Sequence, residues 1–177
     1  MKDTQAFPIA VFALIAIAII ETVLAASWNR GYFRSGLVIF RQRISLVGAI
    51  PTFPDPEHLE ALFKSRWVPS LRFRELSPGE LAFREAYFEF HLVSYTPIMH
   101  GHLEALPAER VVLVEGRLNS FTLGFVLMPA LWMHEFPLFP FLPILVGACG
   151  LLYLIQASRY RGVASALLDK EWGKPAV

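Results

Sequence analysis

The chain has 177 residues, of which 55% are hydrophobic, 14% aromatic and 18% charged. Soluble domains usually carry about 25% charged residues, so this composition favours a membrane protein. The net charge of +1 gives no general argument for nucleic acid as a partner, and the single cysteine, Cys149, excludes an intramolecular disulfide and a multi-cysteine zinc site.

The first apolar segment covers residues 8–28 and follows a short tail over residues 1–7. Its only charged residue is Glu21. About 20 apolar residues are enough to cross a hydrocarbon core about 30 Å thick, so the segment predicts a transmembrane helix. A secretory signal peptide is the alternative, with Lys2 as its basic start and residues 23–25 resembling a cleavage site.

Residues 29–118 carry most of the charged residues and predict a β-rich domain with one short helix. Asp55 followed by Pro56 is a typical helix start, which places that helix at about residues 56–66. Aromatic and β-branched stretches between turn residues predict strands over 32–40, 43–47, 71–75, 80–85, 87–94, 98–106 and 110–118. We expect an antiparallel meander, which in size and strand count resembles small bacterial PH-like domains.

The best candidate metal site is a group of histidines on two neighbouring predicted strands. If residues 87–94 pair with the next strand across a tight turn, His91 lies opposite His100. In the same register Glu89 lies opposite His102, and alternation places all four on one face. Imidazole and carboxylate ligands suit zinc or another divalent metal. The alternative is that this is the solvated side of a half-buried sheet, because the residues match no known metal-site spacing.

The second apolar stretch lies within residues 119–158. As one straight helix it would be roughly 55 Å long, nearly twice the thickness of the hydrocarbon core. The polar pair His134 and Glu135, followed by three prolines, marks a turn near residues 134–139. We therefore expect a transmembrane helical hairpin, and three transmembrane helices in total. The alternative is a single span over about 140–157 after an interfacial helix.

Basic residues flank both apolar segments: Arg30, Arg34, Arg41 and Arg43 follow the first, and Arg159 and Arg161 follow the second. The positive-inside rule places both flanks in the cytoplasm of a bacterial inner membrane, with the N-terminus outside and the 29–118 domain and the C-terminus inside. The arginines would set this topology or bind anionic lipid headgroups. Residues 159–177 predict an amphipathic helix that lies on the inner leaflet or packs on the domain. Its apolar stripe consists of Tyr160, Val163, Ala164, Leu167, Leu168 and Trp172.

Nucleophile elbows, phosphate-binding glycine loops, HExxH and dinucleotide fingerprints are not found in the sequence. We therefore expect a non-catalytic accessory or assembly subunit of a larger membrane complex, without a cofactor. Its expected partners are the lipid bilayer and other membrane subunits, and not nucleic acid. The alternative is a standalone membrane-tethered sensor that binds lipid or a metal, and a third hypothesis is a metal-dependent enzyme using the histidine face.

Overall fold

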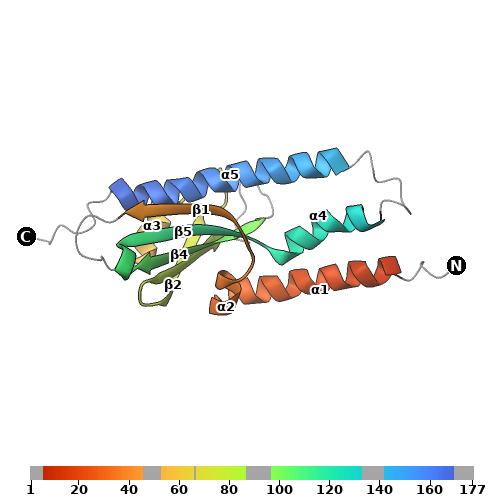
Figure 1. The fold of residues 1–177 in the computed structure, drawn as a ribbon, viewed down its shortest axis with the longest axis horizontal. Helices are drawn as coiled ribbons and strands as arrows, with labels where there is room; N and C mark the ends of the chain where they lie inside the picture. The colour runs from red at the N-terminus through yellow and green to blue at the C-terminus, as the bar shows by residue number, and fades with distance from the viewer. Residues whose placement is uncertain (1–5, 46–52, 66, 87–96, 133–141, 170–177) are drawn as a thin grey trace, which may run out of the picture.

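The computed structural model describes residues 6–45, 53–65, 67–86, 97–132 and 142–169. In chain order the elements are α1 (Ala6–Ala26), α2 (Arg30–Arg34), β1 (Leu37–Ser45), α3 (Pro56–Leu62), β2 (Leu71–Ser77), β3 (Glu80–Glu85), β4 (Met99–Leu106), the 3-10 turn η1 (Pro107–Glu109), β5 (Val111–Leu118), α4 (Ser120–Trp132) and α5 (Leu142–Asp169). A sheet domain forms one end of the molecule, and α1, α4 and the N-terminal half of α5 extend away from it in the same direction (Figure 1).

The sheet has five strands in the order β1-β5-β4-β3-β2, and every neighbouring pair is antiparallel. Strands β2 to β5 form a meander, and β1 joins it at the far side of β5. The predicted antiparallel, β-rich domain is therefore confirmed. Helix α3 lies beside the edge strand β2, and its N-cap residue Asp55 accepts a hydrogen bond from the backbone N–H of Glu57 at 3.1 Å.

The hydrophobic core lies between one face of the sheet and the C-terminal half of α5. Leu81, Leu103 and Val114 lie side by side on three adjacent strands and are almost completely buried. Side chains one helical turn apart on α5 cover them: Ala157, Tyr160, Val163, Ala164 and Leu167. This spacing places one stripe of the helix against the sheet.

Helix α5 is one continuous helix, although the sequence suggested a boundary at residue 158 between a membrane limb and an amphipathic C-terminal helix. The chain has no helix-breaking residue at that point, so the hydrogen-bonded spiral continues. The predicted apolar stripe packs on the sheet from Tyr160 to Leu167, whereas Leu168 is 55% exposed. Trp172, which also belongs to the predicted stripe, lies outside the described residues.

Among the described residues, one helix is long and apolar enough to cross a membrane, and it is the 19-residue stretch Pro8–Ala26 of α1, with a mean hydropathy of 2.7. The prediction of three transmembrane helices is therefore wrong for the described part of the chain. Helix α4 has only 13 residues, which is about 20 Å of helix. The apolar half of α5 ends where Gln156 enters the domain, and the predicted turn at 134–139 lies outside the described residues.

The stretch predicted as a strand over residues 32–40 is divided between α2 and β1. The side chain of Asn29 accepts the backbone N–H of Tyr32 at 3.0 Å and caps the start of α2. A left-handed glycine, Gly36 with φ of 95°, then turns the chain into β1. The aromatic residues of this stretch suggested a strand, but the local cap makes a helical turn of its first part.

Helix α1 ends in a Schellman motif that directs the chain into α2. The N–H of Asn29 donates to the carbonyl of Leu24 at 2.9 Å, and that of Trp28 donates to the carbonyl of Ala25 at 3.2 Å. Trp28 takes the left-handed conformation, with φ of 56°, that glycine usually supplies. Its ring stacks on Phe33 of α2 with centroids 5.4 Å apart, so packing offsets the backbone strain.

The core predicts the effect of adding one methyl group at Gly101. A Cβ atom there would lie 2.2 Å from the buried ring of Phe83, which occupies the space above the glycine. We expect Gly101→Ala to lower the free energy of unfolding by about 2 kcal/mol, because overpacking forces the ring to move. Chemical denaturation in one detergent measures it.

Gly150→Ala is the matched control, because nothing lies within 4 Å of a Cβ placed at Gly150. We expect this variant to be as stable as the wild type or slightly more stable. Adding Phe83→Leu to Gly101→Ala should restore part of the loss. A Gly101→Ala variant with wild-type stability would contradict the close approach of the ring.

Candidate functional site

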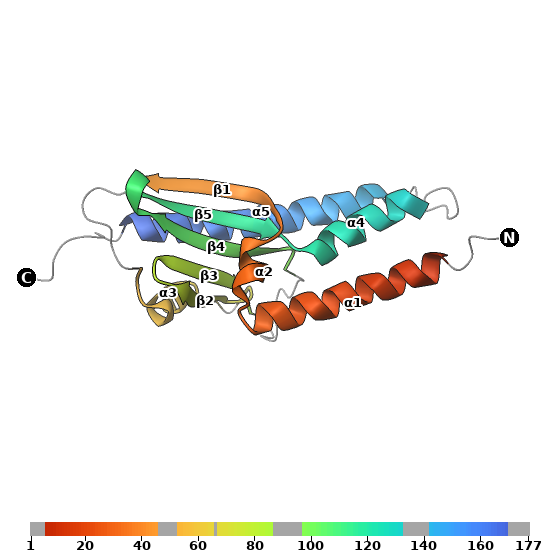
Figure 2. The same ribbon diagram turned by 60° about the horizontal axis from the view of Figure 1, so that its bottom comes forward.

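Helix α2 lies on the face of the sheet opposite α5, where it covers polar residues of β3 and β4 (Figure 2). At the centre is the buried carboxylate of Glu80. Arg34 donates to both of its oxygens, at 2.6 and 2.9 Å, and Arg30 donates at 2.8 Å. Ser77 donates to it at 2.7 Å. This carboxylate therefore binds both arginines of α2 and holds that helix on the sheet.

The pKa of Glu80 is lowered from 4.5 to about 2. Burial on its own raises the pKa, but the hydrogen bonds from Arg34, Ser77 and His102 favour the charged form and together outweigh it. An ionised carboxylate only accepts hydrogen bonds, so His102 donates from Nε2 to Glu80 at 2.8 Å. Its Nδ1 is buried and has no hydrogen-bond partner among the described residues.

The second group of polar contacts lies around His100, beneath Tyr32. Nδ1 of His100 is 2.9 Å from the side-chain oxygen of Asn119, which also accepts from the Tyr32 hydroxyl at 3.3 Å. The Asn119 amide nitrogen donates to the carbonyl of Pro97 at 2.9 Å, which fixes the amide orientation. His100 therefore donates from Nδ1, and its Nε2 faces the carbonyl of Ser35 at 3.3 Å.

Burial lowers the pKa of His100 below its ordinary value of 6.5, although the oxygens of Asn119 and Ser35 that face its two ring nitrogens favour the protonated form. The neutral imidazole lies between Tyr32, at a centroid distance of 4.4 Å, and Phe33, at 5.4 Å. Because the folded chain binds this proton more weakly than the unfolded chain does, His100 favours folding above pH 6.5 and opposes it as the pH falls below that value.

Most of the arginines predicted to set topology or bind lipid form ion pairs with buried carboxylates. Arg30 and Arg34 pair with Glu80, and their side chains are 50% and 46% exposed. Arg41 of β1 pairs at 2.7 Å with the buried Glu115 of β5. These contacts give the three arginines a structural role that the sequence analysis missed.

A similar pair holds α5 to the sheet. Arg159 binds the fully buried carboxylate of Glu85, and Gln156 donates to the same carboxylate at 2.8 Å. The side-chain oxygen of Gln156 accepts the backbone N–H of Ile98 at 3.2 Å. Arg43 and Arg161, the other two predicted arginines, are exposed.

The predicted histidine face is correct in its alternation and wrong in its strand pairing. Met99 and Leu103 face the α5 core, and His100 and His102 face α2. However, β4 lies between β3 and β5, so His102 is opposite Ala82 and Glu115 instead of Glu89.

His91 and Glu89 lie outside the described residues, as do His134 and Glu135. In the described part of the chain, no three histidine, cysteine or acidic side chains are placed to hold a metal ion. His100 and His102 are buried under α2, so the alternative of a solvated face is wrong for them. The metal site proposed for these histidines stays a prediction.

The charged residue of α1, Glu21, caps the start of α4. Its two carboxylate oxygens accept the backbone N–H groups of Ser120 at 2.6 Å and Phe121 at 2.9 Å. These N–H groups have no partner within the helix, and the carboxylate also suits the positive end of the helix dipole. Further along, Gly124 lets Leu14 of α1 approach α4 closely.

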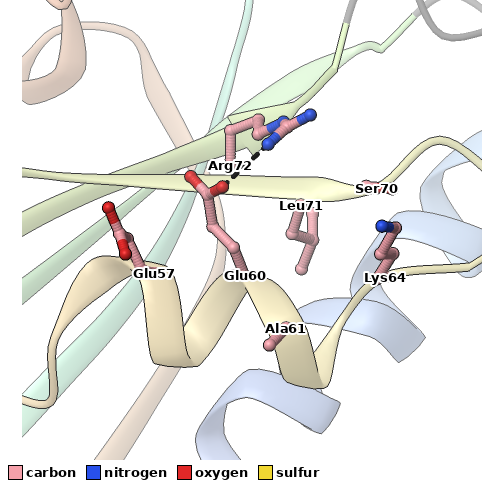
Figure 3. A pocket seen from close by; sticks show the side chains of 7 residues that line it. All are labelled: Glu57, Glu60, Ala61, Lys64, Ser70, Leu71 and Arg72. Carbon is pink, nitrogen blue, oxygen red and sulfur yellow. Dashed lines mark hydrogen bonds and ion pairs between the residues drawn. The ribbon is translucent and has the colours of Figure 1, made fainter.

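A cleft of about 250 Å³ lies between α3 and β2. In Figure 3, Glu57 and Glu60 rise from α3 towards β2, Arg72 bonds to Glu60, and Lys64 lies towards the other end. Glu60 also accepts the backbone N–H of Phe73 at 3.0 Å. Because β2 is an edge strand, this carboxylate satisfies a backbone group that would otherwise be free to pair with another strand.

No family model, curated protein or solved structure matches the chain. The resemblance to PH-like domains therefore stays a prediction from size and strand count.

The buried acids Glu80, Glu85 and Glu115 were not among the site residues predicted from the sequence. Alternation does place Glu80 and Glu115 on the polar face of the sheet, which was a usable signal. Their burial depends on α2, and the sequence of α2 suggested a strand. Glu85 faces α5, and no pattern near it in the sequence indicates that Arg159 is its partner.

We predict that Glu80→Gln lowers the free energy of unfolding by about 2 kcal/mol at pH 7, because it removes the negative charge of a buried ion pair and replaces one of its two acceptor oxygens with an NH2 donor. The loss stays below that of a fully buried pair since the two arginines are half exposed and can turn to water. Denaturant unfolding in one detergent measures the difference. Exposed Glu57→Gln is the control, with an expected change within about 0.5 kcal/mol.

The same pair of proteins tests the titration of Glu80. Its pKa is lowered in the folded state, so its stabilisation is fully present above pH 4.5 and is lost as the pH falls towards 2. The stability difference between the wild type and Glu80→Gln should therefore shrink between pH 5 and pH 3. A difference that stays constant over this range would show that the carboxylate is not held in an ion pair.

Proposed function

We propose that this chain is a non-catalytic accessory or assembly subunit of a larger membrane protein complex. The observation that carries the proposal is the apolar surface of α1, because only 6% of its candidate membrane-spanning window is buried inside the protein. Ile9, Phe12 and Ile19 are all more than half exposed. A contiguous apolar surface of this kind indicates contact with lipid or with another protein.

The exposed apolar surface continues on the helices beside α1. Helix α4 packs against α1, and the N-terminal half of α5 exposes Ile144, Leu151 and Leu154. We propose that α1 spans the bilayer and that α4 and this half of α5 insert next to it. The chain leaves the sheet at the start of α4 and returns to it through α5, so both ends of this apolar pair lie on the side of the domain (Figure 1).

The domain is proposed to lie on the cytoplasmic side of a bacterial inner membrane, with the N-terminus outside. The arginines that follow α1 support this orientation even where they form ion pairs. The positive-inside rule counts lysine and arginine near the ends of a span, and acidic residues change it little.

The way in which the domain is attached supports a structural role. The buried carboxylate of Glu80 binds two arginines of α2, the helix that follows α1 directly. The buried carboxylate of Glu85 binds Arg159 of α5, the helix that continues from the apolar end of the molecule. These ion pairs hold the domain against the helices. Such an attachment suits a subunit that positions a partner at a defined height above the membrane.

A standalone membrane-tethered lipid sensor is the second candidate, and a cleft beside Glu21 favours it. Purification separates the two. We expect the full chain, extracted from its native membrane in a mild detergent, to co-purify with one or more membrane proteins in fixed stoichiometry. A monodisperse chain without a protein partner would contradict the accessory role and leave the sensor.

Cysteine labelling tests the orientation. In a Cys149→Ser background, the exposed Glu57 is changed to cysteine and intact cells are treated with a membrane-impermeant maleimide. We expect labelling only after the membrane is permeabilised, whereas Asp3→Cys in the same background should react in intact cells. Labelling of Glu57→Cys in intact cells would reverse the proposed orientation.

A further inference from the structure

A cleft of about 480 Å³ opens where α1, α2 and the start of α4 meet. It is lined by residues of two kinds, apolar ones along α1 and polar ones around both ends of α2 and the first residue of α4: Ile17, Ile20, Glu21, Leu24, Asn29, Gly31, Tyr32, Ser35 and Ser120. An apolar wall on a candidate membrane-spanning helix thus continues into a polar end beside the domain. The shape and chemistry suit an amphipathic molecule.

Glu21 is the only lining residue that carries a charge at neutral pH. Its carboxylate accepts two backbone hydrogen bonds from α4, and a carboxylate has about four acceptor positions. The arginines of α2 do not balance this charge from within the cleft, because Arg30 and Arg34 bind Glu80 on the sheet. Charge complementarity therefore favours a cationic ligand group.

The polar lining offers further acceptors for such a group. The side-chain oxygen of Asn29 accepts one hydrogen bond, from the N–H of Tyr32, and has a second lone pair. The hydroxyl of Ser35 donates to the carbonyl of Tyr32, so its oxygen is available as an acceptor. These acceptors line the same cleft as Glu21 and give an ammonium headgroup polar neighbours besides the carboxylate.

We propose that this cleft binds a phospholipid with a primary ammonium headgroup, phosphatidylethanolamine. The ammonium bonds to Glu21 at the polar end, and an acyl chain lies along Ile17 and Ile20. This inference rests on the proposed insertion of α1 in the bilayer. Insertion would place a lipid headgroup beside the polar end of the cleft and an acyl chain beside its apolar end. It differs from the expected binding of anionic lipid by arginines, because the recognising charge is a carboxylate.

Lipid retention tests the proposal. The full chain is reconstituted in nanodiscs with equal amounts of phosphatidylethanolamine, phosphatidylcholine and phosphatidylglycerol, and the lipids that stay bound on release are identified by native mass spectrometry. We expect phosphatidylethanolamine to be retained roughly tenfold over phosphatidylglycerol, because a charge-assisted hydrogen bond is lost. Phosphatidylcholine should fall between them, since its quaternary ammonium keeps the charge but has no N–H donor.

Glu21→Gln should abolish the preference, because the variant has no negative charge in the cleft. Its amide oxygen can still accept a hydrogen bond from α4, so part of the helix cap is kept. Glu109→Gln, at an exposed site on the sheet domain, is the matched control and should keep it. Equal retention of the three lipids by the wild type, or an unchanged preference in Glu21→Gln, would overturn the proposal. If Glu21→Gln does not fold, the order of the three lipids on the wild type decides.

The outcome is distinguishable from failure of the proposed function. A chain that retains phosphatidylethanolamine without a protein partner contradicts only the accessory role. A chain that inserts in nanodiscs without a lipid preference contradicts only the cleft, and leaves a cationic side chain of a partner as its occupant. A chain that stays in solution without detergent contradicts membrane insertion and the lipid site together.

Discussion

The buried carboxylate of Glu80 is the contact on which the α2 side of the molecule depends. It accepts hydrogen bonds from Arg30 and Arg34 of α2 and from His102 of the sheet. Without this acceptor, the two guanidinium groups would lose their ion-pair partner on the sheet. The contact also fixes α1, because only the short Schellman corner at Trp28 separates α1 from α2.

The opposite face of the sheet uses the same interaction with a different helix. Glu85 is fully buried and binds Arg159 and Gln156 of α5, next to the large apolar contact made by Tyr160. Burying a carboxylate is costly unless a cation and hydrogen bonds compensate for the lost water. Each of these acids therefore selects one arrangement of helix on sheet, while apolar packing supplies most of the stabilisation.

These contacts connect the apolar helices directly to the sheet domain. Helix α5 runs without interruption from its exposed apolar half into the core, and Glu21 ties α1 to α4 where the chain leaves the sheet. A connection of this kind supports the proposal that the chain positions partners in a membrane complex.

The sequence by itself determined features that depend on neighbours a few residues apart. These are the apolar helix α1, the helix start at Asp55, and the alternation that separates Met99 from His100. The tertiary structure alone decided that β4 lies between β3 and β5, that α2 covers the histidines, and that the arginines bind acids. Arg34 and Glu80 are 46 residues apart, and Arg159 and Glu85 are 74 apart. The order of strands and the packing of helices bring such pairs together, and backbone geometry within a segment carries no information about either.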